Sequence, residues 1–328
     1  MTIPCLLIGD IGGTNARFAL AKPDSAGFFS ELTLACEDYE SAEQGIADYF
    51  KRSASGEPDV ICLAAAGPVV DDHVELTNNH WVLDRRALGE RFPSAKVKLL
   101  NDFESISYSI PLLDETDVST VGLVPAGTGD KRQLTFGVLG PGTGLGTGGL
   151  LVRDSGIYPI VGEGSHEGFA PESALQFRVL KQLRRRFDRV SNERLVSGPG
   201  LENIYWALCR IREKATSELS ASEIFSRVLA NEDPIAVEAV QLFFEVLGQA
   251  AGNLALALGA FDGVYLAGGI VKRYPDLLNS SRFRFGFENK GRHRPLMEKV
   301  PTLLITHQQP GLLGASYCAR ALFQKGAA

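Results

Sequence analysis

The sequence is poor in cysteine and carries no excess of basic charge. Its five cysteines stand at positions 5, 36, 62, 209 and 318, and no two of them have a CxxC or other metal-binding spacing. A scattered set of this kind is typical of reduced thiols in the cytoplasm. The net charge of −6 gives no general attraction to nucleic acid or to an anionic membrane. We therefore expect a cytoplasmic protein without a nucleic-acid partner.

Several segments that define other protein classes are also missing. No stretch approaches the roughly 18 uninterrupted apolar residues of a membrane-spanning helix, and the amino terminus shows no signal-peptide pattern. The dipeptide Gly-Lys occurs nowhere, so there is no Walker A loop. The protein-kinase signatures HRD and DFG are absent as well. The sequence thus excludes two common ways of binding ATP and predicts no membrane span.

Glycine, in contrast, is abundant. The 35 glycines in 328 residues cluster at turns, which indicates sites built from backbone groups and not low-complexity sequence. A composition of 45% hydrophobic and 22% charged residues is that of an ordinary globular protein. At about 150 residues per domain, the length allows two domains.

The first glycine-rich turn follows an apolar strand near the amino terminus. The sequence IGDIGGTNARFAL, residues 8–20, predicts a strand, a tight turn and a second strand. The N–H groups exposed in such a turn, with the side chains of Thr14 and Asn15 beside them, suit a phosphate group. The carboxylate of Asp10 would repel that phosphate unless a hydrated Mg²⁺ lay between them. The alternative is a plain β-hairpin in which these residues serve only the turn.

The same pattern returns from Gln133, where LTFGVLG, PGTGLGTGG and LLVRDSG again predict strand, turn and strand. Two such hairpins, one in each half of the chain, could hold a polyphosphate, although two unrelated hairpins would have the same pattern. The second turn contains a formal GxGxxG from Gly144 to Gly149. A dinucleotide site needs a helix to begin within these glycines, whereas Leu150–Val152 predict a strand. The pattern therefore argues against a nicotinamide cofactor.

Strands and helices alternate along the chain, which predicts an α/β fold. Strands are expected at 28–36, 59–66, 73–76, 96–100, 263–266 and 302–306, and helices at 39–53, 103–110, 173–187, 202–212, 234–259 and 311–323. Pro111 and Pro310 are the expected domain boundaries. They give a first domain of residues 1–111 plus 310–328 and a second of residues 112–309. Ser191 is expected to cap a further helix that begins at Asn192.

Polar residues at strand ends and in one loop indicate a chemistry. Ligands of open α/β sheets collect at the carboxyl ends of strands, where Asn101 and Asp102 stand. Together with a phosphate-binding turn and a loop carrying Glu163 and His166, they suggest phosphoryl transfer to an acceptor rich in hydroxyl groups. Asp102 is our candidate for the general base, and the side chains expected to hold other hydroxyls are Asn101, Glu163, His166 and Glu193. Asp102 could instead be only the N-cap of the helix that follows, Glu193 could only favour a helix start, and His166 could be structural.

A further glycine pair stands at the end of the strand predicted at 263–266. Gly268 and Gly269 would let a flat ring or a ribose lie against the backbone. The alternative is a simple turn from strand to helix.

These motifs together resemble one known family. In chain order, GDIGGTN, TNNHW, LLNDFESIS, GPGTGLG, GEGSHEGFAP, SNERLVSGPGL, LAGGIV and PGLLGAS are similar to the bacterial glucokinases over nearly the whole chain. Each motif alone is weak, but their common order is specific. The resemblance implies the actin-like ATPase fold, which is ribonuclease H-like and is shared by sugar kinases, actin and heat-shock chaperones, with two α/β domains flanking an active-site cleft. It also implies transfer of the terminal phosphate of ATP to the 6-hydroxyl of glucose, with Mg²⁺.

The resemblance also implies roles for individual residues. Asp102 would be the general base, and the sugar would be bound by Asn101, Glu163, His166 and Glu193, with Asn79 as a weaker candidate. The first phosphate loop would comprise Gly9, Asp10, Ile11, Gly12, Gly13, Thr14 and Asn15, with Asp10 reaching Mg²⁺ through water. The second would comprise Gly142, Thr143 and Gly144, and the adenosine would lie by Gly268 and Gly269.

Other functions remain as alternatives. A kinase for another hexose or for an amino sugar would have a similar pattern, and so would a sugar-binding protein without catalysis. A DNA-binding regulator of this lineage would need a helix-turn-helix ahead of the first phosphate loop, where only seven residues precede Ile8. Related kinases of the repressor/kinase group carry a cysteine-rich zinc loop that this sequence lacks. A sugar-independent ATPase would have no use for the sugar-binding set, and a homodimer is suggested only by analogy of fold.

Overall fold

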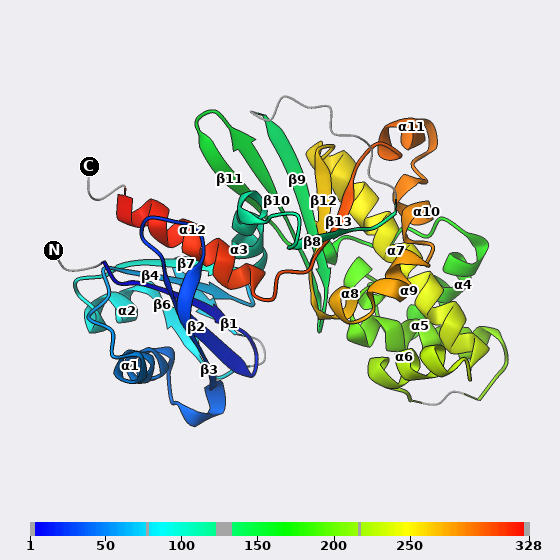
Figure 1. The fold of residues 1–328 in the computed structure, drawn as a ribbon. Helices are drawn as coiled ribbons and strands as arrows, with labels where there is room; N and C mark the ends of the chain where they lie inside the picture. The colour runs from blue at the N-terminus through cyan, green and yellow to red at the C-terminus, as the bar shows by residue number, and fades with distance from the viewer. Residues whose placement is uncertain (1–3, 77–78, 123–132, 216–217, 325–328) are drawn as a thin grey trace. The chain divides into compact units, whose positions relative to one another are not determined.

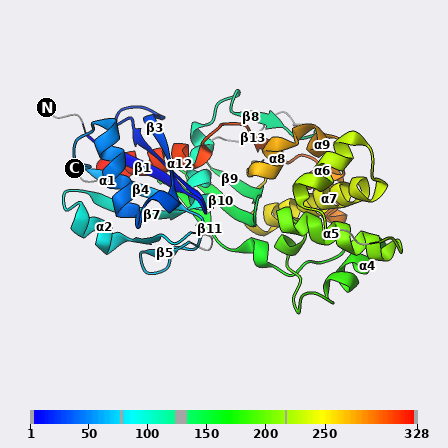
Figure 2. The same cartoon turned by 90° about the horizontal axis from the view of Figure 1, so that it is seen from below.

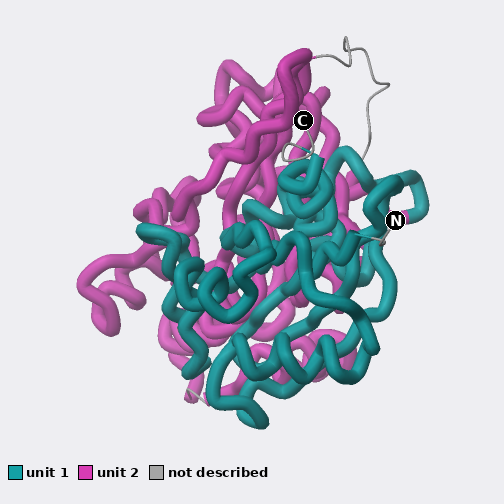
Figure 3. Tube along the Cα trace, turned by 90° about the vertical axis from the view of Figure 1, so that its left-hand side faces the viewer, with its two compact units in different colours: residues 1–116, 307–328 teal, residues 117–306 magenta. Residues whose placement is uncertain are grey.

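The computed structural model describes residues 4–76, 79–122, 133–215 and 218–324. Contacts divide the chain into two compact units, one of residues 1–116 and 307–328 and one of residues 117–306 (Figure 3). We call these unit 1 and unit 2. Each unit contains its own sheet and its own hydrophobic core.

The two units divide at residues 116/117 and 306/307, a few residues from the expected boundaries Pro111 and Pro310. Both prolines lie inside helical elements of unit 1. Pro111 lies in a 3₁₀ turn, Ile110–Leu112, that continues helix α3 (Asp102–Ser109). Pro310 is the first residue of helix α12 (Pro310–Gln324). Proline is tolerated there because the N–H groups of a first helical turn have no partner within the helix.

The sheet of unit 1 has the strand order β3-β2-β1-β4-β7 (Figure 1). Its strands are β1 (Leu6–Ile11), β2 (Asn15–Ala21), β3 (Phe28–Ala35), β4 (Val60–Ala65) and β7 (Lys96–Asn101). Strands β1, β2 and β3 pair in antiparallel fashion, whereas β1, β4 and β7 run parallel. Ile11, Ala65 and Asn101 therefore stand in one row at the carboxyl edge of the parallel strands.

Alternating side chains of this sheet enter two separate layers. On one face, Leu7 and Leu63 pack with Ile46 of helix α1 (Ala42–Ser53). On the other face, Ile8 and the small residues of β4 pack with Leu312 of α12. The remaining elements of unit 1 are β5 (His73–Glu75), β6 (Val82–Asp84) and α2 (Arg85–Arg91). Thr77 and Asn78 of the TNNHW motif lie outside the described residues.

Unit 2 repeats the topology of unit 1. Its sheet has the order β11-β10-β9-β12-β13-β8, with β9 (Leu134–Pro141), β10 (Leu145–Arg153), β11 (Gly156–Val161), β12 (Gly263–Leu266), β13 (Thr302–Ile305) and β8 (Val118–Thr120). Strands β11, β10 and β9 are antiparallel, and β9, β12 and β13 are parallel. The two glycine-rich hairpins, β1–β2 and β9–β10, thus occupy the same place in two equivalent sheets. The strand expected directly after the GxGxxG pattern is confirmed as β10.

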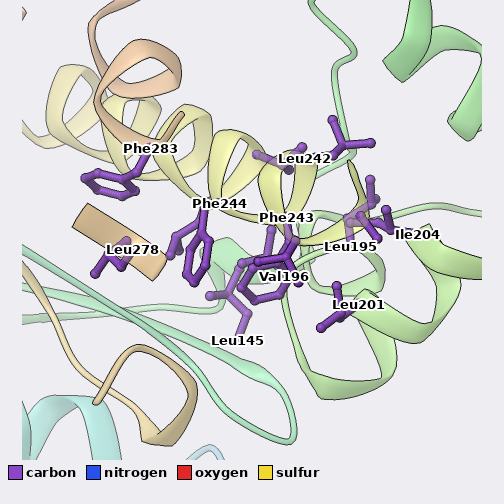
Figure 4. Close-up of a cluster of buried hydrophobic side chains, with 14 of the residues drawn as sticks. Leu145, Leu195, Val196, Leu201, Ile204, Leu242, Phe243, Phe244, Leu278 and Phe283 are labelled. Atoms are coloured by element: carbon purple, nitrogen blue, oxygen red, sulfur yellow. The ribbon is translucent and has the colours of Figure 1, made fainter. Parts of the chain in front are cut away.

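Helix α7 (Pro234–Leu258) lies at the centre of the core of unit 2 (Figures 2 and 4). It packs against α5 (Gly198–Ile211), α6 (Ala221–Ala230) and α10 (Phe283–Glu288), and Gln176 of α4 (Ala174–Leu183) donates a hydrogen bond to its Glu245. Phe243 and Phe244 of α7 are fully buried. Among the described residues, α7 alone is long and apolar enough to cross a membrane, with a mean hydropathy of 1.3, but 78% of its most apolar stretch is buried. Its hydrophobicity is that of a core helix.

Two predictions about helix ends are wrong. Ser191 makes no capping bond, and only a 3₁₀ turn, Asn192–Arg194, follows it. The true cap is Ser197, whose hydroxyl accepts the N–H of Gly200 at the start of α5. The helix predicted at 202–212 therefore begins earlier, and Gly198-Pro199-Gly200 form its first turn. Proline fits in a first turn because its missing N–H would have no helical partner.

Unit 2 also contains short helices that the sequence did not predict, namely α8 (Gly269–Arg273), α9 (Pro275–Asn279) and α11 (Arg294–Met297). They connect β12 to α10 and α10 to β13. Short segments like these offer too few residues for a clear hydrophobic period.

Candidate active site

The turn between β1 and β2 forms the first glycine-rich loop. Its Gly12 N–H donates to the carbonyl of Asn15 at 3.0 Å, which closes the turn. The side-chain amide of Asn79 donates to the carbonyl of Gly12 at 3.0 Å, and the amide oxygen accepts the N–H of Trp81 at 3.0 Å. Asn79, predicted as a weak sugar ligand, therefore holds the first glycine-rich turn in place.

The members of this loop do not all lie in the turn. Gly9 and Ile11 are part of β1. Ile11 is fully buried, and Leu63 and Phe18 leave no room for a side chain at position 9. The turn itself consists of the residues between the strands, Gly12, Gly13 and Thr14. Because the N–H of Gly12 already donates to Asn15, the N–H groups that this turn offers to an anion are those of Gly13 and Thr14.

Asp10 lies near the end of β1, on the face that α12 covers. Burial raises the pKa of Asp10, and the guanidinium of Arg17, its cross-strand neighbour, acts in the opposite direction. A Cβ on Gly311, in the first turn of α12, would lie 2.9 Å from Oδ2 of Asp10. Glycine thus lets the positive end of the helix dipole approach the carboxylate, which favours the charged form.

The surroundings of Asp10 fit a metal ion held chiefly by a substrate. Among the residues that the structure describes, no three His, Cys, Asp or Glu side chains are grouped so as to hold a metal. Mg²⁺ commonly keeps several waters and binds through one or two carboxylates together with substrate phosphates. A single carboxylate beside a glycine-rich turn that is predicted to bind phosphate fits that mode.

Asn101 and Asp102 join β7 to α3, and their roles differ. Asn101 is the N-cap: its oxygen accepts the N–H groups of Phe103 at 2.9 Å and Glu104 at 3.3 Å, and the Glu104 carboxylate accepts the N–H of Asn101. This reciprocal pair is a capping box. The alternative in which Asp102 is only the N-cap is therefore wrong, since Asp102 is the first residue of the helix proper.

Asn101 has a second structural bond. Its amide Nδ2 donates to the carbonyl of Gly67 at 3.0 Å, which links the end of β7 to the segment after β4. An amide group has two N–H donors, so one N–H of Asn101 is not used by this bond. A sugar hydroxyl could be bound by that remaining donor.

The second glycine-rich turn, Gly142, Thr143 and Gly144, joins β9 to β10. Gly142 N–H donates to the carbonyl of Gly144 at 2.8 Å, and the carbonyl of Gly142 accepts the N–H of Gly198 at 2.8 Å. Oε2 of Glu193 accepts the N–H of Leu145 at 2.9 Å. The first turn of α5 and the carboxylate of Glu193 thus both hold this loop.

The predicted sugar residues Glu163 and His166 share one 3₁₀ turn, Gly164–His166, with Glu163 at its start. The carbonyl of Glu163 accepts the N–H of His166 at 3.0 Å, and both side chains are exposed. The following residues pair with the segment before Glu193, since Asn192 N–H donates to the carbonyl of Glu167 at 3.0 Å. Unit 2 therefore brings the segments of Glu163, His166, Glu193 and the second glycine-rich turn together.

Thr147 of β10 is a residue that sequence reasoning missed. Its hydroxyl oxygen accepts the N–H of Gly164 at 3.0 Å and donates to the carbonyl of Gly162 at 3.3 Å. A cavity of about 30 Å³ lies beside it, lined by residues that include Leu139, Leu145, Asn192 and Leu254. That volume suits one water molecule and not a hexose. The only sequence signal for this role is a threonine within a glycine-rich strand. That signal is weak, because the partner of Thr147, Gly164, lies 17 residues away in a loop.

Gly268 and Gly269 lie between β12 and α8. Gly268 has φ +93°, and an added Cβ would meet the carbonyl oxygen of Pro141 at 2.5 Å, whereas nothing lies within 4 Å of a Cβ on Gly269. Ala267 N–H donates to the carbonyl of Leu139 at 2.7 Å. The end of β12 is therefore pressed against the end of β9, next to the second glycine-rich turn.

Two sheets of the same topology, each with a glycine-rich hairpin, are typical of one class of protein, the sugar kinases with an actin-like ATPase fold. The structure superimposes on a glucokinase from an Antarctic psychrotroph with a TM-score of 0.87, at 32% identity, covering 96% of this chain and 98% of the other. A glucokinase from Balamuthia mandrillaris, solved in complex with glucose, matches with a TM-score of 0.74 at 25% identity, covering 97% and 94%. A ROK hexokinase from Thermus thermophilus shares the fold, with a TM-score of 0.65 at 20% identity over 98% and 99% of the two chains.

Sequence comparison identifies the family. A family profile described as Glucokinase matches residues 7–322. The chain is 41% identical to a glucokinase from Marinobacter nauticus over 94% of this chain and 95% of that protein, and 40% identical to one from Colwellia psychrerythraea over 97% and 96%. The chain belongs to the glucokinase family.

Proposed function

We propose that this protein transfers the terminal phosphate of ATP to the 6-hydroxyl of glucose, giving glucose 6-phosphate and ADP in the cytoplasm. Family membership over nearly the whole chain supports the reaction class. The local observation that carries the proposal is the capping box of α3. Because Asn101 is the N-cap, the capping role does not fall to Asp102, whose carboxylate lies in the first turn of α3 at the carboxyl end of a parallel strand and accepts the N–H of Phe103 at 2.9 Å.

Asp102 would act as the general base. As the 6-oxygen of glucose forms its bond to the terminal phosphorus, the bond from phosphorus to the bridging oxygen breaks, ADP leaves, and the hydroxyl proton passes to the Asp102 carboxylate. Asp102 is the first residue of α3, so its carboxylate lies at the amino-terminal end of that helix. In phosphoryl transfer the protein contributes mostly orientation and charge stabilisation, so the position of Asp102 matters as much as its basicity.

The remaining sugar hydroxyls would be bound by Asn101 of unit 1 and by Glu163, His166 and Glu193 of unit 2. Carboxylates accept hydrogen bonds, whereas the second N–H of the Asn101 amide donates one. Because a hydroxyl group both donates and accepts, this set can bind sugar hydroxyls in either role. Asn79 is the weakest member, because its amide already braces the first phosphate turn.

The phosphates of ATP would bind the N–H groups of the two glycine-rich turns, and Gly268 and Gly269 would lie by the adenosine. Asp10 would hold Mg²⁺ through water. When bound, Mg²⁺ neutralises charge on the phosphate oxygens during transfer. The bracing of the second turn by Glu193 and Gly198 supports this assignment, because a fixed turn keeps its donors oriented before the substrate arrives.

The test is release of ADP from purified protein with ATP, Mg²⁺ and a panel of hexoses, run beside Asp102→Asn. We expect turnover with glucose that falls by roughly 10²- to 10⁴-fold in the variant, while glucose still binds. Preference for mannose, fructose or an N-acetyl amino sugar would correct the substrate. Hydrolysis that does not depend on sugar, or an unimpaired Asp102→Asn protein, would overturn the mechanism. Glucose binding without turnover would indicate a sugar-binding protein.

A further inference from the structure

Helices α3 and α12 of unit 1 pack backbone against backbone. A Cβ on Gly314 of α12 would overlap the carbonyl oxygen of Ser105 and would lie 3.1 Å from the nitrogen of Ser109, so only glycine permits this approach. Helix α3 begins at Asp102, the proposed base. The position of α3 on α12 therefore fixes the position of Asp102.

One side-chain hydrogen bond crosses this helix pair near its functional end. The hydroxyl of Ser105 donates to the carbonyl of Gly311 at 2.8 Å, and Ser105 is fully buried. Ser105 lies one helical turn beyond the amino terminus of α3, and Gly311 lies in the first turn of α12. The bond thus ties the two helices where both begin, although the residues are 206 positions apart in sequence.

The other side of Gly311 faces Asp10. A Cβ at position 311 would lie 2.9 Å from Oδ2 and 3.1 Å from Cγ of Asp10. The proposed Mg²⁺ carboxylate therefore occupies the space where a side chain of residue 311 would lie, and the carbonyl of Gly311 accepts the hydroxyl of Ser105 in α3. A single residue connects the base at the end of β7 with the carboxylate at the end of β1.

We propose that Ser105 is a positioning residue for phosphoryl transfer, which fixes the distance between Asp102 and Asp10 through its bond to Gly311. This inference rests on the proposed function, because it needs both carboxylates to act on one substrate pair. Without the hydroxyl, α3 keeps its capping box and its apolar contacts but loses the bond that sets its position at this end. A shift on the order of 1 Å at a reacting group can cost about 100-fold in rate.

Helix α3 contains a matched control. Ser107 is also fully buried, but its hydroxyl donates to the carbonyl of Phe103 at 2.7 Å, within the same helix. Removing that hydroxyl deletes a buried hydrogen bond of similar length without loosening α3 from α12. Ser105→Ala and Ser107→Ala therefore differ in whether a bond between helices is lost.

The experiment compares kcat, the KM for glucose and the dissociation constant of glucose for the wild-type protein and the two variants. We expect Ser105→Ala to lower kcat by about 10-fold or more with little change in glucose binding, and Ser107→Ala to leave kcat near the wild-type value. Thermal unfolding should shift by similar amounts in both variants. If Ser105→Ala does not fold, Ser105→Cys takes its place, because a thiol keeps the size of the side chain and donates only weakly.

Equal kcat values in the two variants would overturn the inference, and so would a loss in Ser105→Ala confined to glucose binding. The proposed function has a separate readout. A wild-type protein that phosphorylates no hexose would refute the function itself, whereas an active wild type with an equally active Ser105→Ala variant would refute only the role of Ser105.

Discussion

Oε2 of Glu193 accepts the backbone N–H of Leu145 at 2.9 Å, and this bond joins a predicted sugar ligand to the second glycine-rich turn within unit 2. Gly144 precedes Leu145, and a Cβ there would lie 2.6 Å from the same oxygen. The carboxylate can approach the turn because position 144 has no side chain. Because Glu193 is proposed to bind a sugar hydroxyl and also holds the turn proposed to bind phosphate, it should couple the binding of the two substrates.

The first prediction concerns this coupling. Glu193→Gln keeps an oxygen that can accept the Leu145 N–H, but a bond to a neutral acceptor is roughly half as strong as one to a carboxylate. We expect the KM values for both glucose and ATP to rise, by about tenfold and severalfold respectively. Steady-state kinetics with each substrate varied in turn measure both effects.

Glu163→Gln is the control for this prediction, because Glu163 belongs to the same sugar set but lies on a different loop from Glu193. It should raise the KM for glucose and leave the KM for ATP near its wild-type value. Gly144→Ala should reproduce the ATP effect of Glu193→Gln by displacing the carboxylate. An unchanged KM for ATP in both Glu193→Gln and Gly144→Ala would refute the coupling.

The second prediction separates two adjacent glycines. Gly268→Ala places a side chain at φ +93° and against the carbonyl of Pro141, whereas Gly269→Ala points into open space. Because the first obstacle is backbone, Gly268→Ala should lower the free energy of unfolding by about 1–3 kcal/mol, and Gly269→Ala by less than about 1 kcal/mol. Urea unfolding without nucleotide measures both values. Equal losses would mean that the end of β12 adapts to a side chain.

Much of this site could be predicted from the sequence because its signals are local. Gly12, Gly13 and Thr14 do form the turn between two strands, and Asp102 does follow a strand directly. The capping residue of α3 also has a local signal in the sequence. Glu104 stands three residues after Asn101, which is the spacing of a capping box, whereas no Glu or Gln stands three residues after Asp102.

Other features have no local signal. The Ser105–Gly311 bond joins residues 206 positions apart, and nothing near either residue in sequence indicates its partner. Ser191 stands before an acidic residue and resembles an N-cap, but the segment around it pairs with the loop at Gly168 and forms only a 3₁₀ turn. Tertiary pairing here outweighs the local preference for a helix.

The third prediction concerns pH and the core helix of unit 2. Burial alone would raise the pKa of Asp233, but hydrogen bonds from the Tyr205 hydroxyl, from two N–H groups at the start of α7 and from Arg227 outweigh it and hold the pKa below its ordinary value. A carboxyl whose folded-state pKa is lowered stabilises the fold above its ordinary pKa, and this stability is lost as the pH falls through the folded-state value.

Asp233→Asn should therefore unfold more easily than wild type at neutral pH, by about 1 kcal/mol, and this difference should shrink below about pH 4. Denaturant unfolding at several pH values measures it. Tyr205→Phe removes the 2.7 Å bond to Asp233 and should lose part of the same pH dependence while keeping the carboxylate. A difference that stays constant from neutral to acid pH would show that the charge of Asp233 contributes nothing.

The last prediction separates the two roles assigned to Asn101. Its oxygen caps α3, and its amide donates to Gly67 and leaves one N–H for a sugar hydroxyl. Asn101→Asp keeps the capping oxygen and removes both donors, whereas Asn101→Ala removes everything. Because aspartate caps about as well as asparagine, Asn101→Ala should lose about 1 kcal/mol of stability, and Asn101→Asp distinctly less.

Both variants should raise the KM for glucose by roughly tenfold or more, since each lacks the donor. Thermal unfolding without ligands and glucose kinetics, made on the same preparations, distinguish the two effects. If Asn101→Asp bound glucose as tightly as wild type, the amide would have no part in sugar binding, and Asn101 would serve only to hold α3 and thereby Asp102 in place.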